Sequence, residues 1–151
     1  MSTEITKAKE CVYRLLKIRE RSEKEIYGKL KIKKFSDETI QGVILQFKNL
    51  RFIDDRRFAK LWIQSRLAKP FGLARIKLEL NSKGITKEII NEELSALEEF
   101  FPTDEKISEL AKRRLNKYKK TDPIKAKRRI FEYLLRRGFN FEQVQKATKN
   151  I

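Results

Sequence analysis

Apolar residues recur along the chain in three stretches that share one spacing. In each stretch an apolar residue is followed four positions later by a leucine and five positions after that by another apolar residue. The stretches are residues 26–36, 76–86 and 130–140. Spacings of three and four place side chains on one helix face, so each stretch predicts an amphipathic helix that ends in a turn. The copies are offset by 50 and 54 residues, which indicates a tandem repeat.

Each stretch also carries signals for a tight turn and for a second helix. Gly84 and Gly138 stand where a residue with a left-handed backbone commonly ends a helix, and Lys34 takes this place in the first copy. A polar residue suited to cap the next helix follows each turn, namely Ser36, Thr86 and Asn140. The helices after the turns are expected over about residues 37–48, 87–98 and 141–149.

One more helix is expected ahead of each pair, over about residues 8–20, 55–68 and 104–119. The middle helices have start signals of their own, which are a capping box at Ser22–Glu25, a chain break at Pro70–Gly72 and the pair Asp122–Pro123. The sequence therefore predicts an all-α fold of three tandem three-helix, helix-turn-helix-like repeats that form an elongated curved array. The expected repeats are residues 1–53, 54–101 and 102–151.

The stretch of residues 50–62 joins the first repeat to the second. Asp54 is suited to cap the helix that starts there, after an extended entry at Phe52–Ile53. The positions that fall at helical spacing on one face are Phe58, Leu61, Trp62 and Ser65. We expect the three aromatic side chains of the stretch to belong to the core; the alternative for Trp62 is a stacking platform for a base.

Charge adds a prediction about partners. The chain has 37 Lys and Arg against 21 Asp and Glu, a formal net charge of +16. A surface of this sign favours polyanions or acidic protein grooves, although a lysine-rich but otherwise ordinary surface is the alternative. Residues 101–151 carry 15 basic and 6 acidic residues, more than half of the excess. On a helix, Lys125, Arg128, Arg129 and Arg136 form one broad stripe opposite the apolar face.

Candidate chemistry is sparse. The chain has no His and one Cys, so no zinc site, other metal site or cofactor is expected, and Cys11 is expected in the core. A metal-dependent nuclease using Asp54, Asp55 and Glu79 is an alternative, but adjacent carboxylates at a helix start point in different directions. We therefore expect no enzyme. A sequence-specific DNA-binding protein of the helix-turn-helix type is another alternative, although the helices after the turns show no evident set of base-reading side chains.

The first residues are polar rather than a secretory leader, and no apolar run approaches the roughly 20 residues that a membrane helix needs. A cytoplasmic protein without membrane contact is expected.

These motifs resemble the RecX family of RecA regulators. The resemblance rests on Phe52-Ile53-Asp54-Asp55-Arg56-Arg57-Phe58-Ala59 followed by Trp62 and Arg66, on Lys83-Gly84-Ile85, and on Leu134-Leu135-Arg136-Arg137-Gly138-Phe139. It extends over about residues 8–149, with Lys34 in place of the family's usual glycine. The family-motif residues expected to be structural are Phe52, Asp54, Asp55, Phe58, Ala59 and Trp62.

The resemblance implies a partner and an activity. RecX proteins are all-helical, built of three three-helix repeats, and have no catalytic site. They bind the RecA filament on single-stranded DNA along its groove and restrain ATP hydrolysis, strand exchange and filament extension. A monomer is expected. Exposed basic residues are the expected contacts, namely Arg57, Lys60, Arg66, Lys69, Arg75, Lys83, Arg113, Arg114, Lys117, Arg128, Arg129, Arg136 and Arg137.

Overall fold

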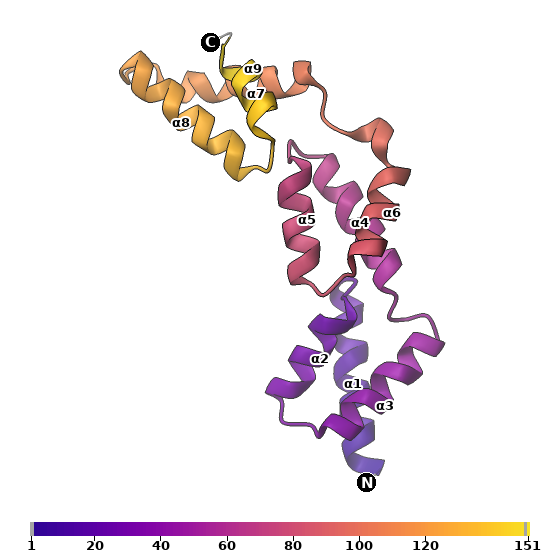
Figure 1. Cartoon of the computed structure of the whole chain (residues 1–151). Helices are drawn as coiled ribbons and strands as arrows, with labels where there is room; N and C mark the ends of the chain where they lie inside the picture. The colour runs from indigo at the N-terminus through magenta and orange to yellow at the C-terminus, as the bar shows by residue number, and fades with distance from the viewer. Residues whose placement is uncertain (1, 150) are drawn as a thin grey trace. The chain divides into compact units, whose positions relative to one another are not determined.

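The computed structural model describes residues 2–149 and 151, and across these residues the chain is helical, without a strand (Figure 1). The α-helices are α1 (Ser2–Ile18), α2 (Glu23–Ile32), α3 (Asp37–Asn49), α4 (Asp55–Leu67), α5 (Leu73–Ser82), α6 (Lys87–Ala96), α7 (Asp104–Leu115), α8 (Pro123–Arg136) and α9 (Phe141–Lys149). Two short 3₁₀ turns, η1 (Glu98–Phe100) and η2 (Asn116–Tyr118), follow α6 and α7. The helices form three consecutive groups of three, which confirms the predicted all-α fold of three-helix repeats.

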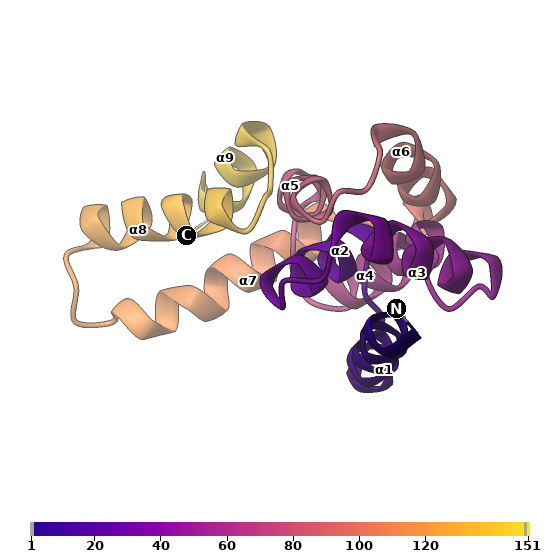
Figure 2. The same cartoon turned by 90° about the horizontal axis from the view of Figure 1, so that it is seen from below.

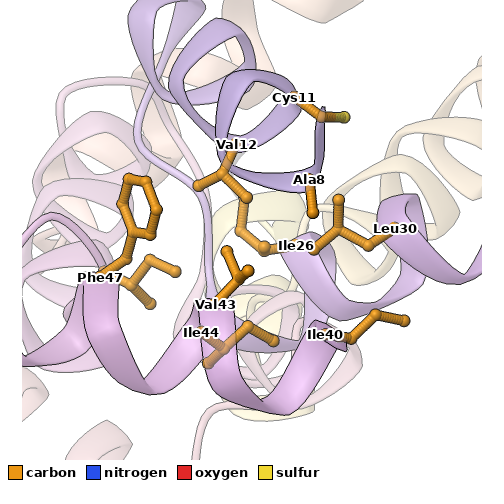
Figure 3. Packing of buried hydrophobic residues seen from close by; sticks show 10 residues of the cluster. Ala8, Cys11, Val12, Ile26, Leu30, Ile40, Val43, Ile44 and Phe47 are labelled. Atoms are coloured by element: carbon orange, nitrogen blue, oxygen red, sulfur yellow. The ribbon is translucent and has the colours of Figure 1, made fainter. Parts of the chain in front are cut away.

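The first and third repeats each enclose a core of their own. In the first, α1, α2 and α3 pack on one another, and Figure 3 shows Val12, Ile26 and Val43 among the apolar side chains that they direct inward. In the third, α7 and α8 run side by side and α9 packs against both (Figure 1 and Figure 2). Ile107 and Ile130 are fully enclosed there. Cys11 is buried in the first core, as expected from the sequence.

The chain divides into two compact units. The first unit runs up to Leu61 and includes Leu80–Glu93, and the second consists of Trp62–Glu79 and the chain from Leu94 onward. The middle repeat thus contributes residues to both units. The repeat boundaries at residues 53 and 101 stay a prediction.

The predicted caps are present at the helix starts. Ser22 and Glu25 form the reciprocal capping box of α2, and the Asp122 carboxylate accepts from the backbone N–H of Lys125 at the start of α8, where Pro123 follows. Asn140 and Gln143 form a second reciprocal pair at the start of α9. These contacts satisfy backbone donors that a helix start leaves unpaired, which is why polar residues mark these positions.

The turn inside each repeat has one geometry. Lys34, Gly84 and Gly138 have φ of 67°, 81° and 98°, so the left-handed residue predicted from the sequence is confirmed in all three copies. In the third copy, the N–H of Phe139 donates to the carbonyl of Leu134 and the N–H of Gly138 to that of Leu135. The same pair of bonds ends α2 and α5, and it satisfies carbonyls that a helix end exposes.

Lys34 adopts this geometry at a cost, because a left-handed backbone brings Cβ close to the following carbonyl. Lys34→Gly is expected to raise the free energy of unfolding by about 0.5–1 kcal/mol, the relieved strain exceeding the entropy that glycine adds to the unfolded chain. Lys33→Gly is the control: Lys33 has φ of −79°, so the same change there is expected to lower stability by about 0.5 kcal/mol. Urea unfolding followed by circular dichroism measures both, and equal losses would contradict the assignment of strain to Lys34.

The entry to α4 differs from the prediction of an extended segment. Arg51 has φ of 62°, and the N–H groups of Phe52 and Ile53 both donate to the carbonyl of Phe47. This turn ends α3 in the same way as the turns inside the repeats, and it directs Ile53 rather than Phe52 into the core. Phe52 is 47% exposed and Ile53 is 3% exposed, so the prediction that Phe52 is a core residue is wrong. Its ring instead packs on the edge of the first repeat, 6.1 Å from the Tyr13 ring.

The buried face of α4 is also shifted from the predicted one. Phe58 and Ala59 are buried as expected, but Leu61 is 45% exposed and Ser65 is exposed, while Ile63 is fully buried. Ala59 and Ile63 lie one turn apart, so the face that they share with Phe58 is rotated from the predicted one by about one residue. Trp62 is half-buried, and it is a border residue rather than a core residue.

Candidate interaction surface

The two carboxylates of the joint stretch both serve as helix caps within the first unit. Asp54 accepts from the backbone N–H of Arg57 at 3.0 Å, which confirms the predicted cap of α4. Asp55 accepts from the backbone N–H of Glu23 at 2.9 Å and thereby caps α2. Burial raises the pKa of the Asp55 carboxyl, and the hydrogen bond from Glu23 opposes this shift. Within the described part of the chain, no group of three or more His, Cys, Asp or Glu side chains is placed to hold a metal ion.

Arg57 stabilises the same joint through hydrogen bonds and an ion pair. Its guanidinium donates to Glu20 at 2.7 Å and to the carbonyls of Arg51 and Phe52 at 2.8 and 3.2 Å. These two carbonyls belong to the turn that ends α3, so one side chain satisfies backbone acceptors there and forms an ion pair. The side chain is half-buried, with its donors directed into the first unit.

Glu25 is the centre of a charged cluster in the first unit. It pairs with Arg19 and, at 3.3 Å, with Lys83, and it accepts from the backbone N–H of Ser22 at 3.2 Å. Burial alone would raise the pKa of this carboxyl, but the bonds from Arg19 and Ser22 and the nearby positive charges outweigh burial and lower it. The ionised form of Glu25 is therefore favoured by folding.

Glu25→Gln is expected to lose about 1–2 kcal/mol of stability at pH 7, because a neutral amide makes weaker bonds with the same donors. The pKa of Glu25 is lower in the folded chain than its ordinary value of 4.5, so its contribution is complete above that pH and is lost as the pH falls. The difference in melting temperature between wild type and variant should therefore shrink between pH 6 and pH 3. The exposed Glu10→Gln is the control, and a difference for Glu25→Gln that is independent of pH would contradict the assignment.

Glu79 has the corresponding role in the second unit. It accepts from the indole Nε1 of Trp62 at 3.1 Å, from Arg66 at 2.8 and 3.0 Å and from Arg75 at 3.3 Å. Arg66 also lies over the Trp62 ring, with its guanidinium carbon 4.8 Å from the ring centre. A carboxylate that binds an indole and two guanidinium groups is occupied by structural contacts, so Trp62 is here a hydrogen-bond donor to the fold.

Arg137, in the turn before α9, contacts the segment that precedes α5. Its guanidinium donates to the carbonyl of Pro70 at 2.9 Å and lies 3.9 Å from the centre of the Phe71 ring. The backbone follows the same path, because the N–H of Gly72 donates to the carbonyl of Arg137 at 2.7 Å. A hydrogen bond, a cation–π contact and a backbone bond thus converge on one short segment.

The thirteen basic residues expected as contacts separate into two sets. Five are half-buried rather than exposed because their charged groups serve the fold: Arg57, Arg66, Lys83, Arg114 and Arg137. Arg75 is exposed, yet it bonds Glu79 and the carbonyl of Arg136. The remaining seven are exposed, namely Lys60, Lys69, Arg113, Lys117, Arg128, Arg129 and Arg136. Their role as contacts stays a prediction, and these seven are its best remaining members.

Helix α8 carries a cluster of exposed basic residues in the third repeat. Ala126, Ile130 and Leu134 face the core, and the predicted stripe of Lys125, Arg128, Arg129 and Arg136 is exposed. We call these four residues the α8 basic face. Because α8 is anchored along its whole apolar side, the basic groups are presented on a rigid element, where a partner binds them with little ordering cost.

Taken together, the fold and the surface define an all-α tandem-repeat protein with an exposed basic face and with its joint carboxylates occupied by structural contacts. Family models of RecX match all three repeats: the first three-helix domain at residues 8–46, the second at 54–94 and the third at 103–148. The chain belongs to the RecX family.

Relatives named regulatory protein RecX match over most of the chain. The protein of Clostridium beijerinckii is 32% identical, over 99% of this chain and 70% of its own length. The protein of Prosthecochloris aestuarii is 35% identical, over 87% of this chain and 85% of its own length. The protein of Clostridium acetobutylicum is 36% identical, over 87% of this chain and 62% of its own length. These relatives assign a regulatory role to the chain, in a family that is regulatory and not a known enzyme family.

Solved structures support the fold. The crystal structure of RecX from Lactobacillus salivarius aligns with a TM-score of 0.76, over 99% of this chain and 97% of that one, at 24% identity. A second crystal structure, of a regulatory protein RecX, aligns with a TM-score of 0.81 and 21% identity. The alignment covers 98% of this chain and 74% of that one. None of the helices in the described part of the chain combines the length and apolar content that a bilayer crossing requires.

Proposed function

We propose that the chain binds the RecA filament on single-stranded DNA in the cytoplasm and inhibits its ATP hydrolysis, strand exchange and extension. Membership of the RecX family supports the choice of partner. The observation that carries the proposal is the α8 basic face, which is exposed on a helix anchored along its apolar side. We propose that the protein inhibits the filament by binding to it, as a monomer and without a cofactor.

The α8 basic face is suited to a phosphate backbone. Lysine and arginine side chains that neutralise phosphates release condensed counterions, and this release supplies affinity without reading sequence. A regulator that acts on RecA wherever it assembles needs affinity of this kind. Exposed Lys117, which precedes α8 in the same repeat, is the expected supplementary contact.

Reversing two charges on this face tests the proposal. Arg128→Glu with Arg129→Glu is expected to weaken filament binding by about tenfold or more, because two attractive groups become repulsive to phosphate. The matched control is Lys29→Glu with Lys33→Glu, an equal charge change at exposed positions of the first repeat, which is expected to bind within about threefold of wild type. The measurement is co-sedimentation with RecA assembled on oligo(dT) with a slowly hydrolysed ATP analogue.

Circular dichroism must show native helicity for both double variants. Unchanged binding of the Arg128→Glu/Arg129→Glu protein with native helicity would reject the α8 basic face as the contact. Equal weakening by both double variants would mean that net charge, rather than this face, determines binding.

The alternative of a sequence-specific DNA-binding protein makes a different prediction. Such a protein would prefer one duplex site over bulk DNA by about a thousandfold or more. Selection from random duplexes that enriches no sequence is the result expected from our proposal. The nuclease alternative predicts magnesium-dependent nicking of supercoiled DNA that is lost in Asp54→Ala/Asp55→Ala, whereas both carboxylates are here engaged as caps.

A further inference from the structure

Two adjoining hollows lie in the second unit, apart from the α8 basic face. One has a volume of about 480 Å³ and the other of about 260 Å³. Leu67, Ala68, Phe100 and Lys106 line both, so the two hollows form one continuous depression. We call it the α4–α7 groove, because it runs from the last turn of α4 across η1 to α7. Hollows of this size suit one or two large side chains of a partner.

Apolar side chains form part of the inner surface of the groove. Leu97, Ile107 and Phe139 form part of the lining and belong to the buried core, so the floor is rigid. Phe100 stands at the edge and remains 56% exposed. Its ring is therefore accessible to a side chain that enters the groove.

The charges around the groove indicate which kind of partner it fits. The basic residues Lys69, Lys106 and Arg113 line it together with the acidic residues Glu99 and Glu109. Phosphates would meet both carboxylates of the groove, whereas the four basic side chains of the α8 basic face outnumber the one exposed carboxylate beside them, Glu132. A polypeptide segment carries charges of both signs together with apolar side chains, so a rim of mixed sign and an apolar floor complement protein and not a nucleic acid backbone.

We propose that the α4–α7 groove receives an apolar anchor side chain, aromatic or branched aliphatic, from a segment of the partner protein. This inference rests on the proposed function, in which the partner protein is RecA. It assigns the two components of the filament to two surfaces: the groove binds protein, and the α8 basic face binds the phosphates of the DNA. Anchors seated in such hollows commonly dominate the affinity of an interface.

Filling the groove tests this inference. Ala68 is exposed and lines both hollows, so Ala68→Trp places an indole in the groove without removing a core side chain. Ala96→Trp is the matched control, because Ala96 is exposed at the end of α6 and lines neither hollow. The concentration that halves RecA-catalysed ATP hydrolysis is expected to rise about tenfold or more for Ala68→Trp and to stay within about twofold for Ala96→Trp. Fluorescence anisotropy with labelled oligo(dT), without RecA, should give equal affinities for wild type and both variants.

Each other outcome decides against one specific statement. If wild type inhibits and Ala68→Trp inhibits equally, the groove does not bind RecA. If Ala68→Trp weakens oligo(dT) binding as much as it weakens inhibition, the groove takes a base and not a protein side chain. If wild type itself does not inhibit, the proposed function fails before the groove is tested.

A second variant applies if Ala68→Trp loses helicity. Lys106→Glu reverses an exposed charge that lines both hollows, and Lys120→Glu makes the same change at an exposed position that lines neither. Inhibition should weaken more for Lys106→Glu than for Lys120→Glu. Equal inhibition by these two proteins would reject the groove as the protein contact.

Discussion

Replacing Gly72 by alanine is expected to lower the stability of the second unit by about 3 kcal/mol or more. A Cβ at Gly72 would lie 2.2 Å from the carbonyl carbon of Gly138 and 2.3 Å from the N of Phe139, both of them backbone atoms. Relief requires the two segments to separate. Separation breaks the bonds from the N–H of Gly72 to the carbonyl of Arg137 and from the N–H of Ala74 to the carbonyl of Gly138.

The chain offers a matched control for this substitution. Gly28 and Gly42 lie within α2 and α3, and a Cβ at either would meet nothing within 4 Å. Gly28→Ala and Gly42→Ala are therefore expected to raise stability by about 0.5–1 kcal/mol each, because alanine loses less conformational entropy than glycine in a helix.

Trp62 is the only tryptophan and lies in the second unit, so its fluorescence reports the unfolding of that unit. The Gly72→Ala protein should show a lower urea midpoint by this probe. An unchanged midpoint would mean that the two backbone segments are not in contact in solution.

Removing the Glu79 carboxylate is expected to lower stability by about 2 kcal/mol. Its side chain is 14% exposed and that of Arg66 is 25% exposed, so removal leaves a partly buried guanidinium without its main acceptor. Breaking a fully buried ion pair costs about 3–5 kcal/mol, and the partial exposure of this pair reduces that cost. Glu79→Ala also removes the acceptor of the Trp62 indole, so the fluorescence of the folded protein should change.

Two further variants separate the charge of Glu79 from its place in a helix. Glu79→Gln keeps an acceptor of the same shape and should lose about half as much stability, since bonds to a neutral acceptor are weaker. Glu132→Ala makes the same truncation at an exposed position of α8 and is expected to stay within about 0.5 kcal/mol of wild type. If Glu79→Ala loses no more stability than Glu132→Ala, the contacts of Glu79 with Trp62, Arg66 and Arg75 do not stabilise the fold.

The repeat and its local signals were readable from the sequence because they depend on neighbouring residues. A cap such as Asp54 and a left-handed residue such as Gly138 act within one turn, where spacing alone fixes which groups meet. The same holds for Lys34. Its place in the repeat predicted a left-handed backbone, although lysine does not favour that conformation.

Exposure at the joint was not predictable in the same way. The left-handed residue at Arg51 turns the chain, so the side chain that enters the core is Ile53 and not Phe52.

Composition also cannot separate an arginine that faces solvent from one that satisfies distant carbonyls. Arg57 and Arg137 look equivalent to Arg128 in the sequence, yet the acceptor of Arg137 is the carbonyl of Pro70, 67 positions away along the chain. The α4–α7 groove left no signal for the same reason, because its lining comes from residues 64–139.

Inhibition of RecA by the whole chain tests the account most directly. Hydrolysis of ATP by RecA on single-stranded DNA is measured with the protein added from far below to equal molar amounts. We predict that wild type and the Lys29→Glu/Lys33→Glu control inhibit hydrolysis in proportion to the amount added, and that Arg128→Glu/Arg129→Glu needs about ten times more protein. Hydrolysis that continues unchanged at every amount of wild-type protein would contradict the account.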